Sequence, residues 1–504
     1  MMNLLAEDSD FTNLISDGRY AEGSNFDQTQ EFVLVQFRDT HIFNASWMLE
    51  TQLVLHHMEL KRTPTETGLG DFTVTIPDDM AQSITGTFFL DVDREVDQLR
   101  LSTAATTQQG SHTVKMGLDY TYQDYTGVNT LRDIVLDLPG FVFTYDYQTT
   151  EVTDRRDSEY AVYAQDTWVA NQHLTVQGGV RLDYQSLIGD LNVAPRVGIA
   201  IDPAGNGKSK ILANWGRFYD RVLTDFVEIQ KADGIDQLFN GNSIGKIEYV
   251  TDGELEAPYK DSWTVGYEHA LPGHLKVGVS TTRWEGKNQL RTSWGSVSTL
   301  PSSAGPVAPD AVSIVVGDTN GRAKYTDYKI YLRKLLSRRF EVMGSYTHSR
   351  VRGNYAGSFD PYSRGGLRDD PEALRFTRLD YDRPDVINLS GSVFLPVGFS
   401  MTGIYRYQSG LPYSPLVVLG GGTRIDPDAG RNGARMPPFK SLDLSGAKVF
   451  HISKTDLKIT AQVLNLMNEL NVNLVDTTRA SPSFGSPVAA EQGRIWQFGL
   501  EVRF

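Results

Sequence analysis

Hydrophobic and polar side chains alternate along much of this chain, most clearly in its last ten residues. One parity is apolar and ends on an aromatic residue: Trp496, Phe498, Leu500, Val502 and Phe504. The other parity is polar or small: Gln497, Gly499, Glu501 and Arg503. Because successive side chains of a strand point to opposite faces, the segment predicts a strand with one apolar face. Such a strand, with lipid on one side and water on the other, is typical of an outer-membrane barrel.

The same alternation recurs in the segments 113–122, 174–184, 387–395, 401–407 and 457–463. A half-buried strand of a soluble protein also alternates, so repetition alone does not decide the fold. Aromatic residues stand near the ends of several predicted strands: Tyr160, Trp168, Tyr184, Trp263 and Trp496. An interfacial aromatic band places them there. We therefore predict an all-β fold, an antiparallel transmembrane β-barrel.

About seventeen strands are predicted between the turns. They cover roughly 30–38, 45–60, 96–106, 111–124, 159–169, 173–184, 195–201, 209–219, 261–270, 274–290, 324–335, 339–350, 386–395, 400–409, 441–450, 456–466 and 495–504. Short turns alternate with long polar connections, the layout of a barrel whose long loops lie outside the cell. Residues 1–29 are expected to be an extracellular loop and 30–504 a partial barrel. An odd number of antiparallel strands cannot close, so we expect either a miscount or strands missing at the N-terminal side.

Composition narrows the function classes. The chain has 504 residues, no linker composition and no run near the roughly 18 apolar residues of a membrane helix. The net charge of -14 argues against nucleic acid as a partner, because binding phosphates needs a basic face. Cysteine is absent, which excludes disulfides and thiolate chemistry. The first residues have no signal-peptide pattern, so either the protein is not exported or the true N-terminus is missing.

Three motifs invite a chemical interpretation, and each has a simpler one. The sequence 205–209 (GNGKS) lacks the first glycine of a phosphate loop and is expected to be a hairpin turn. His56 and His57 point to opposite faces of a strand, and His57 with Glu59 lacks a third metal ligand. The acidic run 91–97 could supply calcium ligands, but a solvated acidic loop is favoured. No catalytic motif is present, and we expect no metal site, no cofactor and no enzyme activity.

Two groups of charged residues suggest contacts rather than catalysis. Arg181 and Asp183 share the polar parity of one strand and are expected to face the lumen, where they satisfy each other or plug groups rather than line a path. Arginines also cluster in a long predicted loop, where they could contact an anionic ligand such as a ferric chelate: Arg350, Arg352, Arg364 and Arg368. A flexible surface loop balanced by Asp369 and Asp370 is the alternative.

Four segments carry a family resemblance: 159–185 (EYAVYAQDTWVANQHLTVQGGVRLDYQ), 195–222 (PRVGIAIDPAGNGKSKILANWGRFYDRV), 258–280 (PYKDSWTVGYEHALPGHLKVGVS) and 407–415 (YQSGLPYSP). They resemble the barrel of TonB-dependent outer-membrane receptors of the Oar-like group, which often carries a carboxypeptidase-regulatory-like domain. The resemblance runs from about Ser111 to Phe504. It implies a 22-stranded barrel with an N-terminal plug and a TonB-engaging segment, neither of which is visible here. We therefore expect a C-terminal fragment that lacks the first strands and the plug.

The resemblance implies a TonB-dependent receptor of the bacterial outer membrane that takes up a scarce siderophore, oligosaccharide or peptide. Its partners would be membrane lipid, the unknown ligand, and TonB through the missing part. The final strand also resembles the recognition signal of the barrel-assembly machinery, which could capture an exposed apolar strand by strand addition. The alternatives are a passive porin or adhesion protein with a smaller complete barrel, and a soluble all-β binding module.

Overall fold

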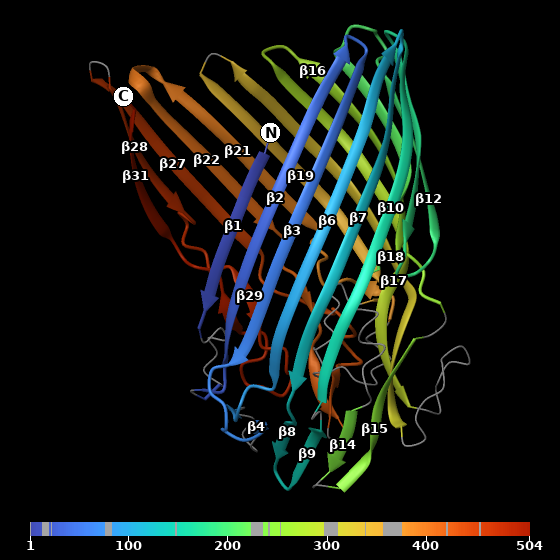
Figure 1. Ribbon diagram of the computed structural model, residues 1–504. Coiled ribbons are helices and arrows are strands. Elements are labelled where there is room, and N and C mark those ends of the chain that lie inside the picture. Colours follow the sequence, from blue (N-terminus) through green and yellow to red (C-terminus); the bar gives the residue numbers. More distant parts are fainter. Residues whose placement is uncertain are drawn as a thin grey trace.

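The computed structural model describes residues 2–12, 20–21, 23–75, 83–146, 149–222, 235–239, 242–251, 254–296, 311–337, 339–355, 375–419, 422–452 and 455–503. One long sheet curls into an upright wall around a lumen (Figure 1). Neighbouring strands of the wall all pair antiparallel, while β4 (Phe72–Thr75) with β8 (Ile134–Leu138) and β15 (Asn242–Thr251) with β18 (Ala311–Ser337) pair parallel in the connections. Among these residues, no helix is both long and apolar enough to cross a membrane. The only helical turn described is η3 (Pro396–Gly398).

The wall follows chain order, each strand pairing with the next. Its strands are β1 (Met2–Phe11), β2 (Phe26–Asn44), β3 (Trp47–Pro64), β6 (Leu90–Gln109), β7 (His112–Leu131), β10 (Thr149–Asn171), β11 (Leu174–Gln185), β12 (Leu191–Ile201), β13 (Ser209–Tyr219), β16 (Tyr259–Leu271), β17 (Leu275–Ser296), β18 (Ala311–Ser337), β19 (Phe340–Gly353), β21 (Asp385–Leu395), β22 (Phe399–Gln408), β27 (Phe439–Ile452), β28 (Thr455–Leu464) and β31 (Ile495–Arg503). Every one of the seventeen predicted strands is present.

Strand β1 corrects one expectation. Residues 2–11 were expected to belong to an extracellular loop, but they pair antiparallel with β2 from Met2↔Phe37 to Phe11↔Gln28. The wall thus gains one strand over the prediction. Within the described residues no pairing joins β1 to β31, so each keeps one edge without a strand partner.

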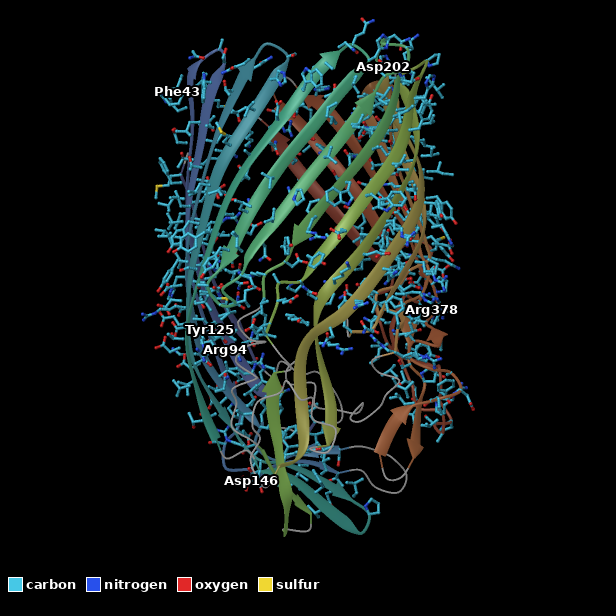
Figure 2. The ribbon with its side chains drawn as sticks, turned by 90° about the vertical axis from the view of Figure 1, so that its right-hand side faces the viewer. Phe43, Arg94, Tyr125, Asp146, Asp202 and Arg378 are labelled. Carbon is cyan, nitrogen blue, oxygen red and sulfur yellow. The ribbon has the colours of Figure 1, made fainter. Side chains whose placement is uncertain are left out.

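Short strands extend the long connections. They are β4 (Phe72–Thr75), β5 (Ser83–Thr85), β8 (Ile134–Leu138), β9 (Phe141–Asp146), β14 (Ile235–Phe239), β15 (Asn242–Thr251), β20 (Thr377–Arg378), β23 (Pro412–Tyr413), β24 (Leu416–Leu419), β25 (Gly422–Ile425), β26 (Ala434–Arg435), β29 (Val472–Val475) and β30 (Pro487–Ala490). Phe43 and Asp202 mark the short-turn end of the wall, and Asp146 lies at the opposite end among the long connections (Figure 2).

The two faces of the wall differ in chemistry, as the alternation predicts. Residues paired directly across neighbouring strands share a face. One face carries rows of apolar side chains such as Val279↔Ile330 and Trp215↔Trp263, and these residues lie exposed on the outside. The other face carries rows such as Tyr163↔Arg181 and Asn214↔Thr264, which face the lumen. A wall that is apolar outside and polar inside fits lipid outside and water inside.

Aromatic rings on the luminal face fill the space left by glycines on the neighbouring strand. Tyr163 lies directly across from Gly117, and Tyr331 from Gly278. A Cβ atom added to either glycine would overlap the tyrosine ring. Tyr331 also donates a hydrogen bond to Glu268 Oε2 at 2.9 Å. Each ring therefore covers bare backbone, an arrangement that supports regular strand pairing.

Gly278→Val should therefore destabilise the wall by about 1–3 kcal/mol, because the new side chain displaces the Tyr331 ring. The urea midpoint for loss of β-structure in detergent measures the effect. Gly178→Val is the matched control, because a Cβ at Gly178 meets nothing within 4 Å. Equal midpoints for the two variants would contradict the packing argument.

Candidate functional site

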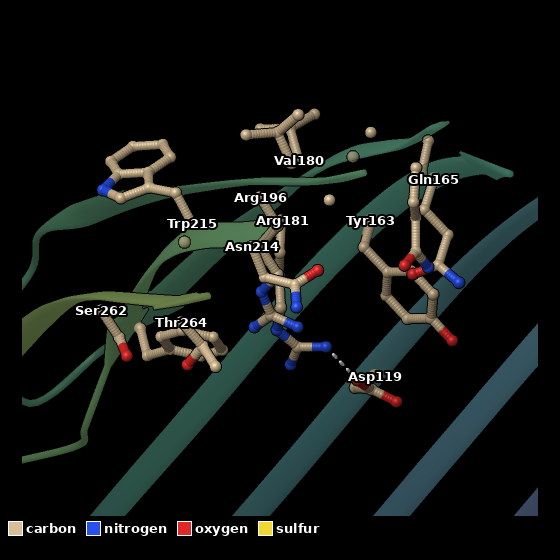
Figure 3. A pocket seen from close by; sticks show the side chains of 18 residues that line it. Asp119, Tyr163, Gln165, Val180, Arg181, Arg196, Asn214, Trp215, Ser262 and Thr264 are labelled. Carbon is tan, nitrogen blue, oxygen red and sulfur yellow. Dashed lines mark hydrogen bonds and ion pairs between the residues drawn. The ribbon is translucent and has the colours of Figure 1, made fainter. Parts of the chain in front are cut away.

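A recess of about 490 Å³ opens in the luminal face of the wall between β7 and β16 (Figure 3). Its charged and amide side chains come from five different strands: Asp119, Gln165, Gln177, Arg181, Arg196 and Asn214. Residues paired directly across two strands share a face, as do residues two positions apart along one strand. Arg196 pairs with Gly179, two positions from Arg181, and Asn214 pairs with Gly198, two positions from Arg196. The alternation of each strand thus creates the recess by placing every second side chain in the lumen.

Arg181 is the centre of this recess. Its Nη1 atom lies 2.6 Å from Asp119 Oδ2 and its Nε atom 2.7 Å from Asp183 Oδ1. The predicted pairing of Arg181 with Asp183 on the luminal face is therefore confirmed. The guanidinium group also lies 5.6 Å from the centre of the Tyr163 ring. All three charged side chains are partly exposed, so each pair contributes at most about 1 kcal/mol to stability.

Arg196 is held differently from Arg181. Its guanidinium lies 4.6 Å from the centre of the Phe218 ring, and no carboxylate among the described residues lies within ion-pair distance. A second recess continues along the same wall and shares Asp119, Arg181 and Arg196 with the first. The luminal wall thus offers paired charges, arginines that lie over aromatic rings, and amide groups. This chemistry suits contact with a polar solute or a polar protein surface rather than bond breaking.

At the loop end of the wall, Asp382 joins three segments of the chain. Its side chain is buried, with 3% exposed. Asp382 Oδ1 accepts a hydrogen bond from the backbone N–H of Val351 at 2.8 Å, and Oδ2 forms an ion pair with Arg435. Arg435 also donates to the carbonyl oxygen of Gly410 at 2.9 Å. The connections after β19, after β22 and before β27 are therefore tied together by one ion pair.

A second tie lies in the same loop layer. Asp426 accepts hydrogen bonds from the backbone N–H of Asp428 at 3.0 Å and from Arg479 Nε at 2.8 Å. These donors hold the pKa of Asp426 below its usual value, the backbone N–H being the larger cause. The carboxylate therefore stays charged at neutral pH, and this tie is lost only as the pH falls through that lowered pKa.

The structure places the predicted assembly signal on the outer face. Trp496, Phe498, Leu500 and Val502 pair with Val463, Ala461, Ile459 and Leu457 of β28. Phe498 and Leu500 are 79% and 70% exposed. Phe504 lies outside the described residues. Capture of this strand by the assembly machinery stays a prediction.

The predicted arginine cluster is divided. Both Arg350, the last residue of the predicted strand 339–350, and Arg352, expected in the loop after it, belong to strand β19, which corrects the expected placement of the cluster in a loop. Arg364 and Arg368 lie outside the described residues. Contact of any of the four with a ligand stays a prediction.

The acidic run 91–97 also belongs to a strand, β6, where a solvated loop was expected. Register places it beside His57, which pairs with Asp97 across β3 and β6. His57 Nδ1 lies 2.9 Å from Asp97 Oδ1 and 3.9 Å from Glu95 Oε1. His57 thus has two carboxylates beside it that the sequence alone did not place there. The three donor groups lie within 4.8 Å of one another on the outer face. The predicted lack of a metal site stays a prediction.

The glycine-rich segment 205–209 is a hairpin turn between β12 and β13, as predicted. Asp202 closes it: Oδ1 accepts hydrogen bonds from the backbone N–H groups of Ala204 and Gly205, at 3.2 and 3.1 Å. The turn's own carboxylate therefore occupies the N–H groups that a phosphate would need.

Comparison with known proteins agrees with this architecture. A family model described as "Outer membrane beta barrel domain" matches residues 6–192. The TonB-dependent transporter Oar of Myxococcus xanthus is 23% identical over 494 residues, which cover 77% of this chain and 45% of Oar. The chain thus spans under half the length of this relative. The homology places the chain in the bacterial outer membrane, and the relatives are transporters and receptors, not enzymes.

Solved structures share the fold. The outer membrane transporter YddB from Escherichia coli superimposes with a TM-score of 0.67 at 13% identity, covering 99% of this chain and 65% of YddB. The ferric-catecholate import receptor Fiu from Escherichia coli gives 0.56 at 12% identity, covering 96% and 65%. The copper transporter OprC gives 0.58 at 13% identity, covering 95% and 66%. These likenesses confirm the predicted all-β antiparallel barrel architecture.

Proposed function

We propose that this chain, an outer-membrane barrel homologous to the TonB-dependent transporter Oar, forms the wall of a transporter that takes up a scarce ligand. The homology to Oar carries the proposal, and the polar luminal wall around Arg181 supports it, since a solute must pass along such a surface. Energy would come from TonB, through a part of the protein outside this sequence. A siderophore, an oligosaccharide and a peptide are the candidate ligands.

The edges of β1 and β31, unpaired within the described residues, argue against the alternative of a smaller complete barrel. Each unpaired backbone group in the hydrocarbon core costs several kcal/mol, so the free edges of β1 and β31 would together cost on the order of tens of kcal/mol. We propose that further strands, outside this sequence, fill the seam between them. A passive porin or adhesion protein made of this wall alone would have to pair β1 with β31 directly.

Cysteine cross-linking tests the seam, because the native chain has no cysteine. In the outer membrane of the producing bacterium, the pair Leu4→Cys and Val35→Cys should form a disulfide, since these residues are direct partners of β1 and β2. The pairs that join Leu4→Cys to Trp496→Cys, Phe498→Cys or Leu500→Cys should not cross-link. Efficient cross-linking of any such pair would show that the wall closes on itself and would favour the porin.

Uptake measurements test the transport proposal. A strain lacking the gene is compared with its parent. The measurement is the accumulation of a ferric hydroxamate, a malto-oligosaccharide and a tripeptide, each radiolabelled. At least one should accumulate at least tenfold faster in the parent and stop when an uncoupler collapses the proton gradient. Uptake of all three that depends on the gene but ignores the uncoupler would indicate a passive porin. No dependence on the gene would contradict transport of these ligand classes.

A further inference from the structure

The outer face of β17–β21 changes from apolar to cationic along its length. Four successive rows of directly paired residues show the change. The first row is apolar (Val279, Ile330, Tyr346 and Ile387), and the next is aromatic and polar (Thr281, Tyr328, His348 and Asp385). Beyond them lie two rows, Arg283↔Thr326↔Arg350 and Glu285↔Lys324↔Arg352↔Arg378. We call their five cations the cationic rim: Arg283, Lys324, Arg350, Arg352 and Arg378.

The cationic rim lies at the level where a membrane presents its headgroups. Tyr328 is 62% exposed on the outer face, in the row next to that of Arg350. Tyrosine residues concentrate at membrane–water interfaces. Arg378 is labelled where the regular wall gives way to the long connections (Figure 2). The rim therefore lies on the lipid side of the wall, beside the outer leaflet, and not in the lumen.

Few carboxylates of the described residues neutralise the cations of the rim. One carboxylate, Glu285, lies among them and is shared by Arg283 and Lys324, at 3.2 and 3.1 Å. For Arg350 and Arg352, no carboxylate of the described residues lies within ion-pair distance. The Nε atom of Arg352 is buried and has no hydrogen-bond partner in the described structure. Arg352 is also paired directly with both Lys324 and Arg378, so three like charges are adjacent.

The outer face of β3 and β6 carries the opposite charge at the corresponding positions. On β3 and β6 the corresponding outer positions beyond the apolar belt hold Glu59, Glu95 and Asp97 beside His57, and the one lysine there, Lys61, is paired with Glu59. The whole chain carries a net charge of -14, so the cationic rim is a local exception. Adjacent arginines repel one another, and an external anion removes that repulsion. Arginine binds phosphate through two parallel hydrogen bonds, and its weak hydration suits an interface.

We propose that the cationic rim binds the phosphate groups of an anionic lipid in the outer leaflet, with Arg350 and Arg352 as the principal contacts. The lipid's chains would lie on the apolar rows of β17–β21 while its phosphates meet the guanidinium groups. The acidic side, on β3 and β6, would not bind the phosphates directly. The proposal requires the wall to stand in the outer membrane, and it does not depend on transport.

Lipid binding by the full-length protein in phosphatidylcholine nanodiscs tests the proposal. The probe is bisphosphorylated lipid A with a spin label on one acyl chain, and the readout is the fraction of probe immobilised by the protein. Arg350→Gln with Arg352→Gln should weaken binding roughly tenfold or more, since each removes a charge-assisted contact. Arg350→Lys with Arg352→Lys should recover part of it. The matched control, Glu59→Gln with Glu95→Gln on the acidic side, should not weaken binding.

Two comparisons make the result decisive. The heat-dependent shift in gel mobility must be unchanged in every variant, so that a loss of binding is not a loss of fold. Added inorganic phosphate at 10 mM, with ionic strength held constant, should displace little of the probe, because it lacks the acyl chains. Wild-type binding by the double glutamine variant would overturn the proposal. Displacement by inorganic phosphate as complete as that by unlabelled lipid A would also overturn it, in favour of a site for free phosphate.

Discussion

Replacing Phe498 and Leu500 together by arginine should abolish stable insertion of the barrel in the outer membrane. Both side chains are on the outer face of β31 and are largely exposed there. An arginine on the lipid face near the bilayer midplane costs about 2–4 kcal/mol, so the pair would cost roughly 4–8 kcal/mol. That is comparable with the whole stability of many domains. The readout is the amount of heat-modifiable protein in the outer-membrane fraction.

The matched control for this variant is Gln497→Arg with Gly499→Arg on the same strand. These two positions alternate with the first pair and face the lumen, where a charge stays in water. The control protein should insert in nearly native amount. Equal loss in both variants would show that β31 does not have one lipid face and one aqueous face.

Asp382→Ala should release the loop layer from the wall. The carboxylate is 3% exposed, and its removal leaves Arg435 without its ion-pair partner and the N–H of Val351 without its acceptor. Breaking a buried pair costs about 3–5 kcal/mol, and because Arg435 is partly exposed we expect about 2–4 kcal/mol here. Hydrogen exchange should accelerate in residues 377–383, 410–419 and 422–435 while the strands of the wall keep their protection.

Asp428→Ala serves as the control, because Asp428 lies in the same loop layer with an exposed side chain. Its loop exchange should match the wild type. If Asp382→Ala changed exchange no more than Asp428→Ala, the ion pair with Arg435 would not be what fixes the loops.

The strands of the membrane wall could be predicted because lipid imposes a strict alternation on each of them. Strand β1 was missed because its sequence, MNLLAEDSDF, places Leu4 and Leu5 on opposite faces and adds four polar residues after them. Its partner β2 supplies the pairing that its own pattern does not show. The predicted strand ends at Arg350, two residues before Arg352, for a related reason. Beyond the hydrocarbon core, a strand no longer needs apolar residues, so the pattern ends before the strand does.

The contacts between distant strands could not be predicted, because they depend on register. Arg181 reaches Asp119 only because β7, β10 and β11 pair in one register, which no single strand specifies. In the same way, His57 meets Asp97 through the pairing of β3 with β6. The pairing of Arg181 with Asp183 was predictable, since two positions along a strand return to the same face.

The most direct test of this account is a spin-label scan of β31 in the membrane, residue by residue from Trp496 to Val502. The cysteine-free chain allows single cysteines without further changes. Labels at 496, 498, 500 and 502 should be accessible to oxygen dissolved in lipid, and labels at 497, 499 and 501 to a water-soluble nickel complex. A period of two in opposite phase for the two reagents is the predicted result. Labels at 496, 498 and 500 that neither reagent reaches would place those residues in a protein core and contradict the membrane wall.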